Sequence, residues 1–338
     1  MSDWSKLYAL ADNIIALKPW RYMYEDEIMG VRDPSTGTIG FLSVMGNLGE
    51  HYSITVYLGE EALGQYLQLT ENSANASAEM VLEIPQLMLS FEEKEFLEKE
   101  DLAIMKANGV KISGKNLWPM FRSYRPGMVP WFFEEQEMKS MVNFLEQFLE
   151  VVTATTSVDL KPKQGKGKGV YFVRECKKEG DLIQWEDTRQ KIEIPAAGEI
   201  RYEVDPGLLA ESRSIPIRKN IYAVDFFLTP AQVREQNKRP FFSYMLLIVD
   251  ERSELVISSE ILDPSSGIER MLAEIPSLLL KALSQGKSLP QAVYAGSPRI
   301  AFILAPLMKS LGIKIQYKTE LRALEMAKMA IFDFFSRG

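Results

Sequence analysis

A chain of 338 residues indicates about two domains, at about 150 residues each. Of its residues, 46% are apolar and 25% are charged, which is typical of a soluble globular protein and excludes the disordered and fibrous classes. The 39 basic and 46 acidic side chains give a net charge of −7, which argues against a protein that coats nucleic acid over its whole surface.

Residues 1–158 predict an α+β domain. Apolar residues recur at helical spacing over 4–15, and this helix should end before Pro19. Three extended segments separated by turn residues then predict an antiparallel meander, at 28–32, 39–45 and 52–58. A helix at 60–69, a strand at 86–91 and a strongly amphipathic helix beginning near Glu134 complete the expected domain.

Residues 159–170 predict a linker or a long hairpin loop between two domains. The run 165–169 alternates glycine with lysine and cannot hold a regular element. The wider segment 161–178 carries seven positive side chains against Glu175 alone. Loops of this composition attract polyanions without sequence preference, and the alternative is a solvated basic loop. The candidate contacts to a polyanion are Lys161, Lys163, Lys166 and Lys168.

Residues 171–338 predict a β-rich lead-in followed by an α/β core at 219–338. Three strands come first in this core, and helices and strands then alternate to the end. Strands are expected at 221–227, 242–249, 255–262, 291–294 and 313–317. Helices are expected at 268–282, from Pro298 onward, and at 320–335.

This order of elements resembles the ribonuclease H-like fold, a mixed sheet shared by integrases and transposases. The resemblance implies an acid on the first strand, at Asp225, that holds divalent cations together with acids at the end of the fourth strand and on a later helix. The fourth strand ends in Val293-Tyr294-Ala295-Gly296, which offers no carboxylate to Mg²⁺. Glu325 fits the helical position, but its spacing to Lys328 equally suits an exposed ion pair. We therefore expect a nuclease scaffold whose metal site is dismantled, with no metal or other cofactor.

Both halves also resemble uncharacterised bacterial proteins that are catalogued only as domains of unknown function. In the first half, the resemblance covers about the first 150 residues and lies in four short motifs, Pro19-Trp20, Ser43-Val44-Met45-Gly46, Gly49-Glu50 and Val56-Tyr57-Leu58-Gly59. This resemblance implies no activity.

The only histidine and the only cysteine offer further chemistry. His51 follows Glu50 and could act as a base, together with nearby tyrosines, in an enzyme built within the first domain. The alternative is a surface or hydrogen-bonded structural role. Cys176 has basic neighbours that could activate its thiol, and the alternative is an inert side chain.

The sequence as a whole favours a non-catalytic intracellular binding or scaffold protein, whose partner is another protein or a nucleic acid. The alternative is a divalent-metal-dependent phosphodiester hydrolase in which Asp225 works with atypical acids, namely Glu260, Asp263 or Glu325, and only then is Mg²⁺ a cofactor. The N-terminus lacks the pattern of a secretory signal, and the longest aromatic-aliphatic stretch, Phe241 to Val249, is too short to span a bilayer. We therefore expect a cytoplasmic protein without a membrane partner.

Overall fold

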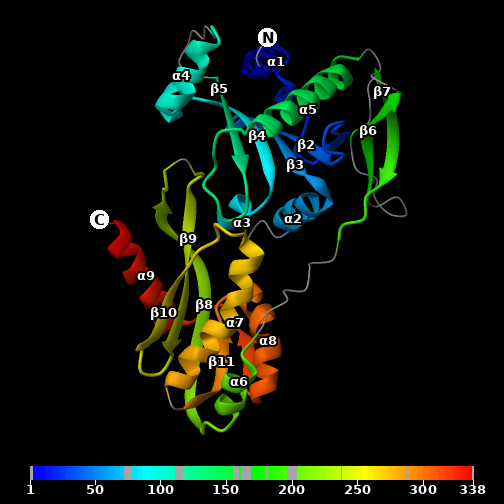
Figure 1. Ribbon diagram of the computed structural model, residues 1–338. Coiled ribbons are helices and arrows are strands. Elements are labelled where there is room, and N and C mark those ends of the chain that lie inside the picture. The colour runs from blue at the N-terminus through cyan, green and yellow to red at the C-terminus, as the bar shows by residue number, and fades with distance from the viewer. Residues whose placement is uncertain are drawn as a thin grey trace. The chain divides into compact units, whose positions relative to one another are not determined.

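The computed structural model describes residues 3–71, 78–110, 117–154, 160, 169–179, 182–195, 204–236, 238–286 and 288–336. The chain divides into two compact units (Figure 1). The first unit comprises Met1–Arg125 and Pro130–Ala196, and the second comprises Pro126–Val129 and Ala197–Gly338. Each unit is built on one mixed β-sheet and has its own buried apolar core.

The first unit contains a seven-stranded sheet with the strand order β5-β4-β3-β2-β1-β6-β7. Its strands are β1 (Met29–Arg32), β2 (Ile39–Met45), β3 (Tyr52–Leu58), β4 (Gln86–Glu92), β5 (Trp118–Tyr124), β6 (Val170–Glu179) and β7 (Leu182–Lys191). Strands β1 to β5 form an antiparallel meander, whereas β6 runs parallel to β1 and β7 returns antiparallel to β6. The antiparallel pairing expected for the segments at 28–32, 39–45 and 52–58 is therefore confirmed.

Helices cover both faces of this sheet. α1 (Asp3–Leu17) and α5 (Glu135–Thr153) pack on one face, and α2 (Gly59–Glu71) packs on the other (Figure 1). α5 approaches the sheet closely at Gly40, because a Cβ there would lie only 2.7 Å from the ring of Phe144. The shorter helical segments are η1 (Pro19–Arg21), α3 (Ala78–Leu82), η3 (Lys94–Phe96) and α4 (Lys99–Ala107).

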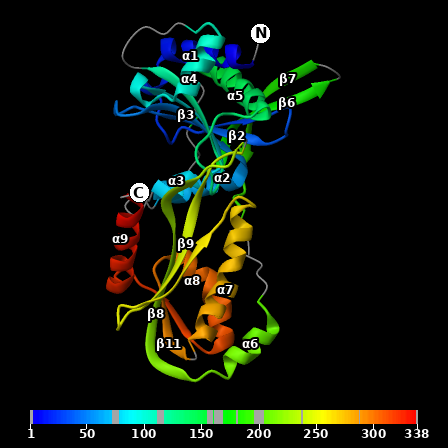
Figure 2. The same ribbon diagram turned by 60° about the vertical axis from the view of Figure 1, so that its left-hand side comes forward.

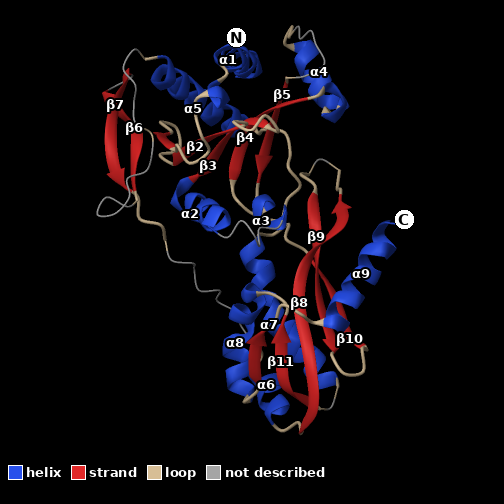
Figure 3. Cartoon of the chain, turned by 180° about the vertical axis from the view of Figure 1, so that it is seen from behind, coloured by secondary structure: helices blue, strands red, loops and turns tan. Residues whose placement is uncertain are grey.

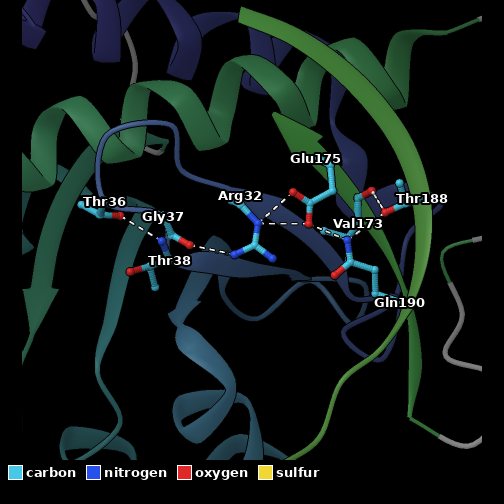
Figure 4. Close-up of polar contacts among 8 residues, drawn as sticks. All are labelled: Arg32, Thr36, Gly37, Thr38, Val173, Glu175, Thr188 and Gln190. Atoms are coloured by element: carbon cyan, nitrogen blue, oxygen red, sulfur yellow. Dashed lines mark hydrogen bonds and ion pairs between the residues drawn. The ribbon is translucent and has the colours of Figure 1, made fainter. Parts of the chain in front are cut away.

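The hairpin of β6 and β7 belongs to the first unit, whereas the sequence assigned residues 171 onward to the second domain, as a β-rich lead-in after the expected linker at 159–170. Most of that linker lies outside the described residues. The parallel pairing of β1 with β6 is supported by a polar network beside the two strands (Figure 4). Arg32 Nε donates to both carboxylate oxygens of Glu175, at 3.0 and 2.8 Å, and Arg32 Nη1 donates to the carbonyl oxygen of Gly37 at 2.8 Å. The structure therefore draws the division between the units after this hairpin, at Ala196.

The second unit contains a five-stranded sheet with the order β10-β9-β8-β11-β12. Its strands are β8 (Ile217–Val233), β9 (Phe241–Asp250), β10 (Val256–Leu262), β11 (Leu289–Ala295) and β12 (Lys314–Tyr317). β9 pairs antiparallel with both β8 and β10. β11 runs parallel to β8, and β12 runs parallel to β11. The sheet is therefore mixed, and the strands expected in this half are all present.

Helices also cover both faces of the second sheet. α7 (Ile268–Gln285) and α8 (Pro298–Leu311) pack on one face, and α9 (Arg322–Ser336) packs on the other against β8 and β9 (Figure 2). α6 (Pro206–Arg213), which the sequence did not predict, packs against α7 and α8. None of the helices in the described part of the chain is long and apolar enough to cross a membrane.

Candidate functional site

Asp225 lies in the interior of the second unit. It sits on β8 opposite Leu247 of β9, and Leu247 packs in the core beneath α9. Cross-strand partners point to the same face of a sheet, so the Asp225 side chain also points toward α9. Only 6% of that side chain is exposed, and a carboxylate so deeply buried must be paired.

Each carboxylate oxygen of Asp225 accepts a hydrogen bond from a different side chain. Lys328 Nζ donates to Oδ2 at 2.7 Å, and Ser297 Oγ donates to Oδ1 at 3.0 Å. Lys328 extends from α9 and lies over the ring of Phe227, with Nζ 5.3 Å from the ring centroid. It also approaches Glu325 Oε1 at 3.4 Å. We call Asp225, Ser297 and Lys328 the Asp225 centre.

The end of β11 is shaped to admit the Asp225 side chain. A Cβ placed on Gly296 would lie 2.7 Å from Asp225 Oδ2 and 2.8 Å from its Cγ, which is closer than atoms in a packed interior can stand. Ser297, the next residue, caps α8 by accepting a hydrogen bond from the backbone N–H of Ile300 at 3.3 Å. The position where the resemblance required a second acid therefore holds a glycine that Asp225 itself needs.

The electrostatics of the Asp225 centre keep Lys328 charged. Burial on its own lowers the pKa of a lysine, but the charge of Asp225 and the hydrogen bond to it outweigh burial and raise the pKa of Lys328. The ammonium thus supplies a permanent counter-charge to the carboxylate. A cation that bound Asp225 would first have to displace Lys328. Within the described ranges, no group of three or more histidine, cysteine, aspartate or glutamate side chains could hold a metal ion.

Of the other acids proposed for a metal site, Glu260 and Asp263 lie apart from Asp225, and Glu325 is joined to it through the shared ammonium of Lys328. Glu325 Oε1 lies 3.4 Å from Nζ of its helical neighbour Lys328, and the Glu325 side chain is mostly exposed. Glu260 pairs across the sheet with Leu246, which packs on the α7 and α8 face, so its side chain lies on the face opposite that of Asp225. Asp263 accepts a hydrogen bond from the backbone N–H of Ser265 at 2.7 Å within its own turn.

His51 and Cys176 occupy separate surroundings in the first unit. His51 Nδ1 lies 3.7 Å from Glu92 Oε1, and the His51 side chain is 44% exposed. Cys176 is half-buried on β6 opposite Trp185 of β7. The polyanion candidates Lys161, Lys163, Lys166 and Lys168 lie outside the described residues.

Two surface hollows open on the first unit. One of about 360 Å³ is lined by Asp3, Lys6, Pro34, Ser35, Lys139, Val142, Asn143 and Ile183. The other, of about 490 Å³, is lined by Asn13, Ala16, Leu17, Leu149 and Thr153. Neither hollow is lined by Glu50 or His51, the residues that the sequence offered for an enzyme in this unit.

Two further buried polar clusters stabilise the first unit, and the sequence did not single them out. Asp33 is almost fully buried and accepts hydrogen bonds from the turn that follows it and from Ser140 of α5. Arg122 of β5 binds Asp101 of α4 through two hydrogen bonds, at 2.8 and 2.6 Å. Asp33 begins the turn pattern Asp-Pro-Ser-Thr-Gly at residues 33–37, which is a recognisable signal, whereas the Arg122 pairing has no local signature.

These observations define a two-unit α/β protein whose second unit holds a buried aspartate neutralised by a lysine. Residues 4–174 match a family model described as Domain of unknown function (DUF7309), and the chain belongs to that family. Residues 208–332 match a second model, Domain of unknown function (DUF6930). The expectation that both halves correspond to domains of unknown function is confirmed. No curated protein and no solved structure matches this chain.

Proposed function

We propose that this chain is a non-catalytic, protein-binding scaffold whose second unit is a ribonuclease H-like domain without a metal site. The strand order β10-β9-β8-β11-β12 supports the fold part of the proposal. Three antiparallel strands are followed by two that run parallel to the first, which matches the order of elements on which the resemblance rests.

The single observation that carries the proposal is the ion pair between Asp225 and Lys328. Two-metal hydrolysis needs several carboxylates that converge on the cations, and Mg²⁺ takes near-octahedral oxygen ligands. Here the ammonium of Lys328 stands 2.7 Å from the aspartate oxygen that such a site would use. An acid at position 296 itself would clash with Asp225, because even a Cβ there would lie 2.7 Å from Asp225 Oδ2.

The charge of the chain favours a protein over a nucleic acid as the partner. The net charge is −7 and the isoelectric point is about 5.2, so long-range electrostatics repel a polyanion. The basic segment 161–168 stays a prediction of a local polyanion contact. A bacterial source and a cytoplasmic location likewise stay predictions from the sequence.

The test of the catalytic part is a cleavage assay on the full chain. Single- and double-stranded RNA and DNA are incubated with the wild type, Asp225→Asn and the control Glu325→Gln, in Mg²⁺, in Mn²⁺ and in chelator. We expect no cleavage above the chelator blank for any of the three proteins. Cleavage in Mn²⁺ that Asp225→Asn abolishes would overturn the proposal and establish the phosphodiester hydrolase.

The choice of a protein partner is tested by titrating labelled RNA and DNA with the full chain at several salt concentrations. We expect no binding stronger than non-specific contact, for which Kd is about 10⁻⁴–10⁻⁶ M. Tighter binding that weakens steeply with salt, and that is lost when Lys161, Lys163, Lys166 and Lys168 are replaced by serine, would assign a nucleic-acid partner instead.

A further inference from the structure

The two sheets expose their outer strands to very different degrees. β5 is covered along one part by Trp131, whose backbone exchanges hydrogen bonds with Ser123 at 2.8 and 3.0 Å. β12 has only four residues. β7 carries a charge at most of its outward positions, including Glu186, Asp187 and Arg189. Short strands and charged side chains are the usual means by which proteins prevent the edge of a sheet from pairing with another chain.

β10 is less protected: it has one charged residue and a register shift between Val256 and Ser258, but it is neither short nor covered by another strand of the described residues. It is seven residues long, ends the order of the second sheet, and carries one charged residue, Glu260. Three of its four aliphatic side chains, Val256, Ile257 and Ile261, are exposed, with 52% of Val256 and 69% of Ile261 accessible, whereas Leu262 is buried. In the described part of the chain, no strand pairs with the outer side of β10 (Figure 3).

Part of the exposed apolar surface of β10 lies on the face of the sheet that α9 partly covers. Ile261 pairs with Met245 of β9, and Met245 packs beneath α9, so Ile261 lies on the α9 face of the sheet. α9 covers β8 and β9 but leaves β10 exposed. A partner strand beside β10 would therefore meet apolar side chains on this face.

The charges around β10 are mostly acidic. The exposed acids are Glu254 before the strand, Glu260 within it and Asp263 after it. The exposed bases are Arg252 within the segment 251–263 and Lys238, which lies near enough to Asp263 to interact with its charge. Acidic groups on both flanks and in the centre of an edge strand attract a basic partner and repel an acidic one.

We infer that β10 binds an extended, basic segment of a partner protein, which adds to the second sheet as a sixth strand. Backbone hydrogen bonds to β10 supply the affinity in this mode, and alternate side chains supply the specificity. Lysine or arginine residues of the partner lie near Glu254, Glu260 and Asp263, and its apolar residues pack on Val256 and Ile261. The inference deepens the proposed scaffold function and rests on it.

A second copy of this chain fits the same edge less well. Two copies of β10 paired antiparallel about Ser259 would bring the two Glu260 side chains to diagonal positions on one face. Like charges in neighbouring cross-strand positions are destabilising. The acidic flanks, Glu254 and Asp263, would add to this repulsion.

The test is a selection of random dodecapeptides, displayed on phage, against the full chain. The best peptide is then synthesised in two forms, one unmodified and one N-methylated at alternate residues so that it cannot pair as a strand. Binding is measured by fluorescence anisotropy with the wild type, Ile261→Lys and the control Ile217→Lys. Ile217 is also aliphatic, 54% exposed and in the second unit, but it lies on β8, and circular dichroism confirms that both variants fold.

We expect selected peptides that alternate lysine or arginine with apolar residues. Ile261→Lys should weaken their binding about tenfold or more, because it places a cation on an edge that attracts cations. N-methylation should weaken binding to a similar degree, and Ile217→Lys should change it by less than about twofold.

Four results overturn the inference. They are a failure to enrich any peptide, enrichment of acidic peptides, binding that Ile261→Lys leaves unchanged, and sedimentation that shows a dimer which Ile261→Lys dissociates. The last result would assign β10 to a second copy of the chain. A chain that cleaves no nucleic acid yet binds peptides away from β10 overturns this inference alone, whereas metal-dependent cleavage overturns the proposed function.

Discussion

Replacing Lys328 with methionine would leave the buried carboxylate of Asp225 with Ser297 as its remaining partner. Methionine keeps most of the volume of the lysine stem, so the change removes the charge and little of the packing. Removing one partner of a buried ion pair costs about 3–5 kcal/mol, because the other charge stays buried without compensation. Since 16% of the Lys328 side chain is exposed and water can approach the pair, we expect the lower end, about 3 kcal/mol.

A double-mutant cycle separates the pairing from the other effects of each substitution. Asp225→Asn keeps the shape of the side chain and leaves Lys328 near solvent and Glu325, so it should cost about 1–2 kcal/mol. In the double variant Asp225→Asn/Lys328→Met neither charge is left unpaired. We therefore expect a favourable coupling energy of about 2 kcal/mol. An equivalent cycle on the exposed pair Lys139–Glu135 should give no measurable coupling.

The assay is urea unfolding, followed by far-UV circular dichroism and by tryptophan fluorescence. The five tryptophans all lie in the first unit, at positions Trp4, Trp20, Trp118, Trp131 and Trp185. Fluorescence therefore reports the first unit, whereas circular dichroism reports both units. We expect the variants to lower the midpoint of a circular-dichroism transition. A coupling energy near zero, or a shift in the fluorescence transition alone, would refute the reasoning.

The ion pair of Asp225 and Lys328 also predicts that the stability of the chain falls at alkaline pH. The pKa of Lys328 is raised in the folded chain, so its contribution is fully present below the unfolded value of about 10.4. The contribution is lost as the pH rises through the higher folded value. Lys328→Met should therefore lose less stability than the wild type between neutral and strongly alkaline pH.

Two further predictions concern Gly296 and Asp33. Gly296→Ala should lower stability by about 1–3 kcal/mol in urea unfolding, because the new Cβ would push Asp225 away from Lys328. The control is Gly286→Ala, whose Cβ would meet nothing nearer than 3.6 Å and which should have little effect. Equal effects of the two substitutions would contradict the proposed packing. Burial raises the pKa of Asp33, but hydrogen bonds from Ser140 and the adjacent turn outweigh burial and lower the pKa. The ionised Asp33 therefore contributes stability above the unfolded-state pKa of about 3.9, and this contribution is lost as the pH falls through the lower pKa of the folded chain. Thermal melts between pH 5 and pH 2 should thus show a shallower loss for Asp33→Asn than for the wild type, and parallel curves would disprove this role.

The sequence predicted most helices and strands, because a helix or a strand is encoded in the spacing of nearby apolar residues. The helix over 4–15, the three meander strands and the alternation of elements after residue 219 are all present. The sequence missed α4, and it missed β5 because a buried arginine on that strand interrupts the expected apolar pattern. Arg122 is tolerated there because Asp101 of α4 neutralises it, and no local pattern reveals such a pairing.

Only the tertiary structure decided which distant residues meet. The sequence identified Asp225 and the missing acid at Gly296, but it paired Lys328 with Glu325 alone. The contact of Lys328 with Asp225 joins residues 103 positions apart, and the pairing of β1 with β6 joins segments separated by more than half of the first unit. Local sequence sets the period and length of an element, whereas the neutralisation of a buried charge depends on which elements pack together, and that is a property of the whole fold.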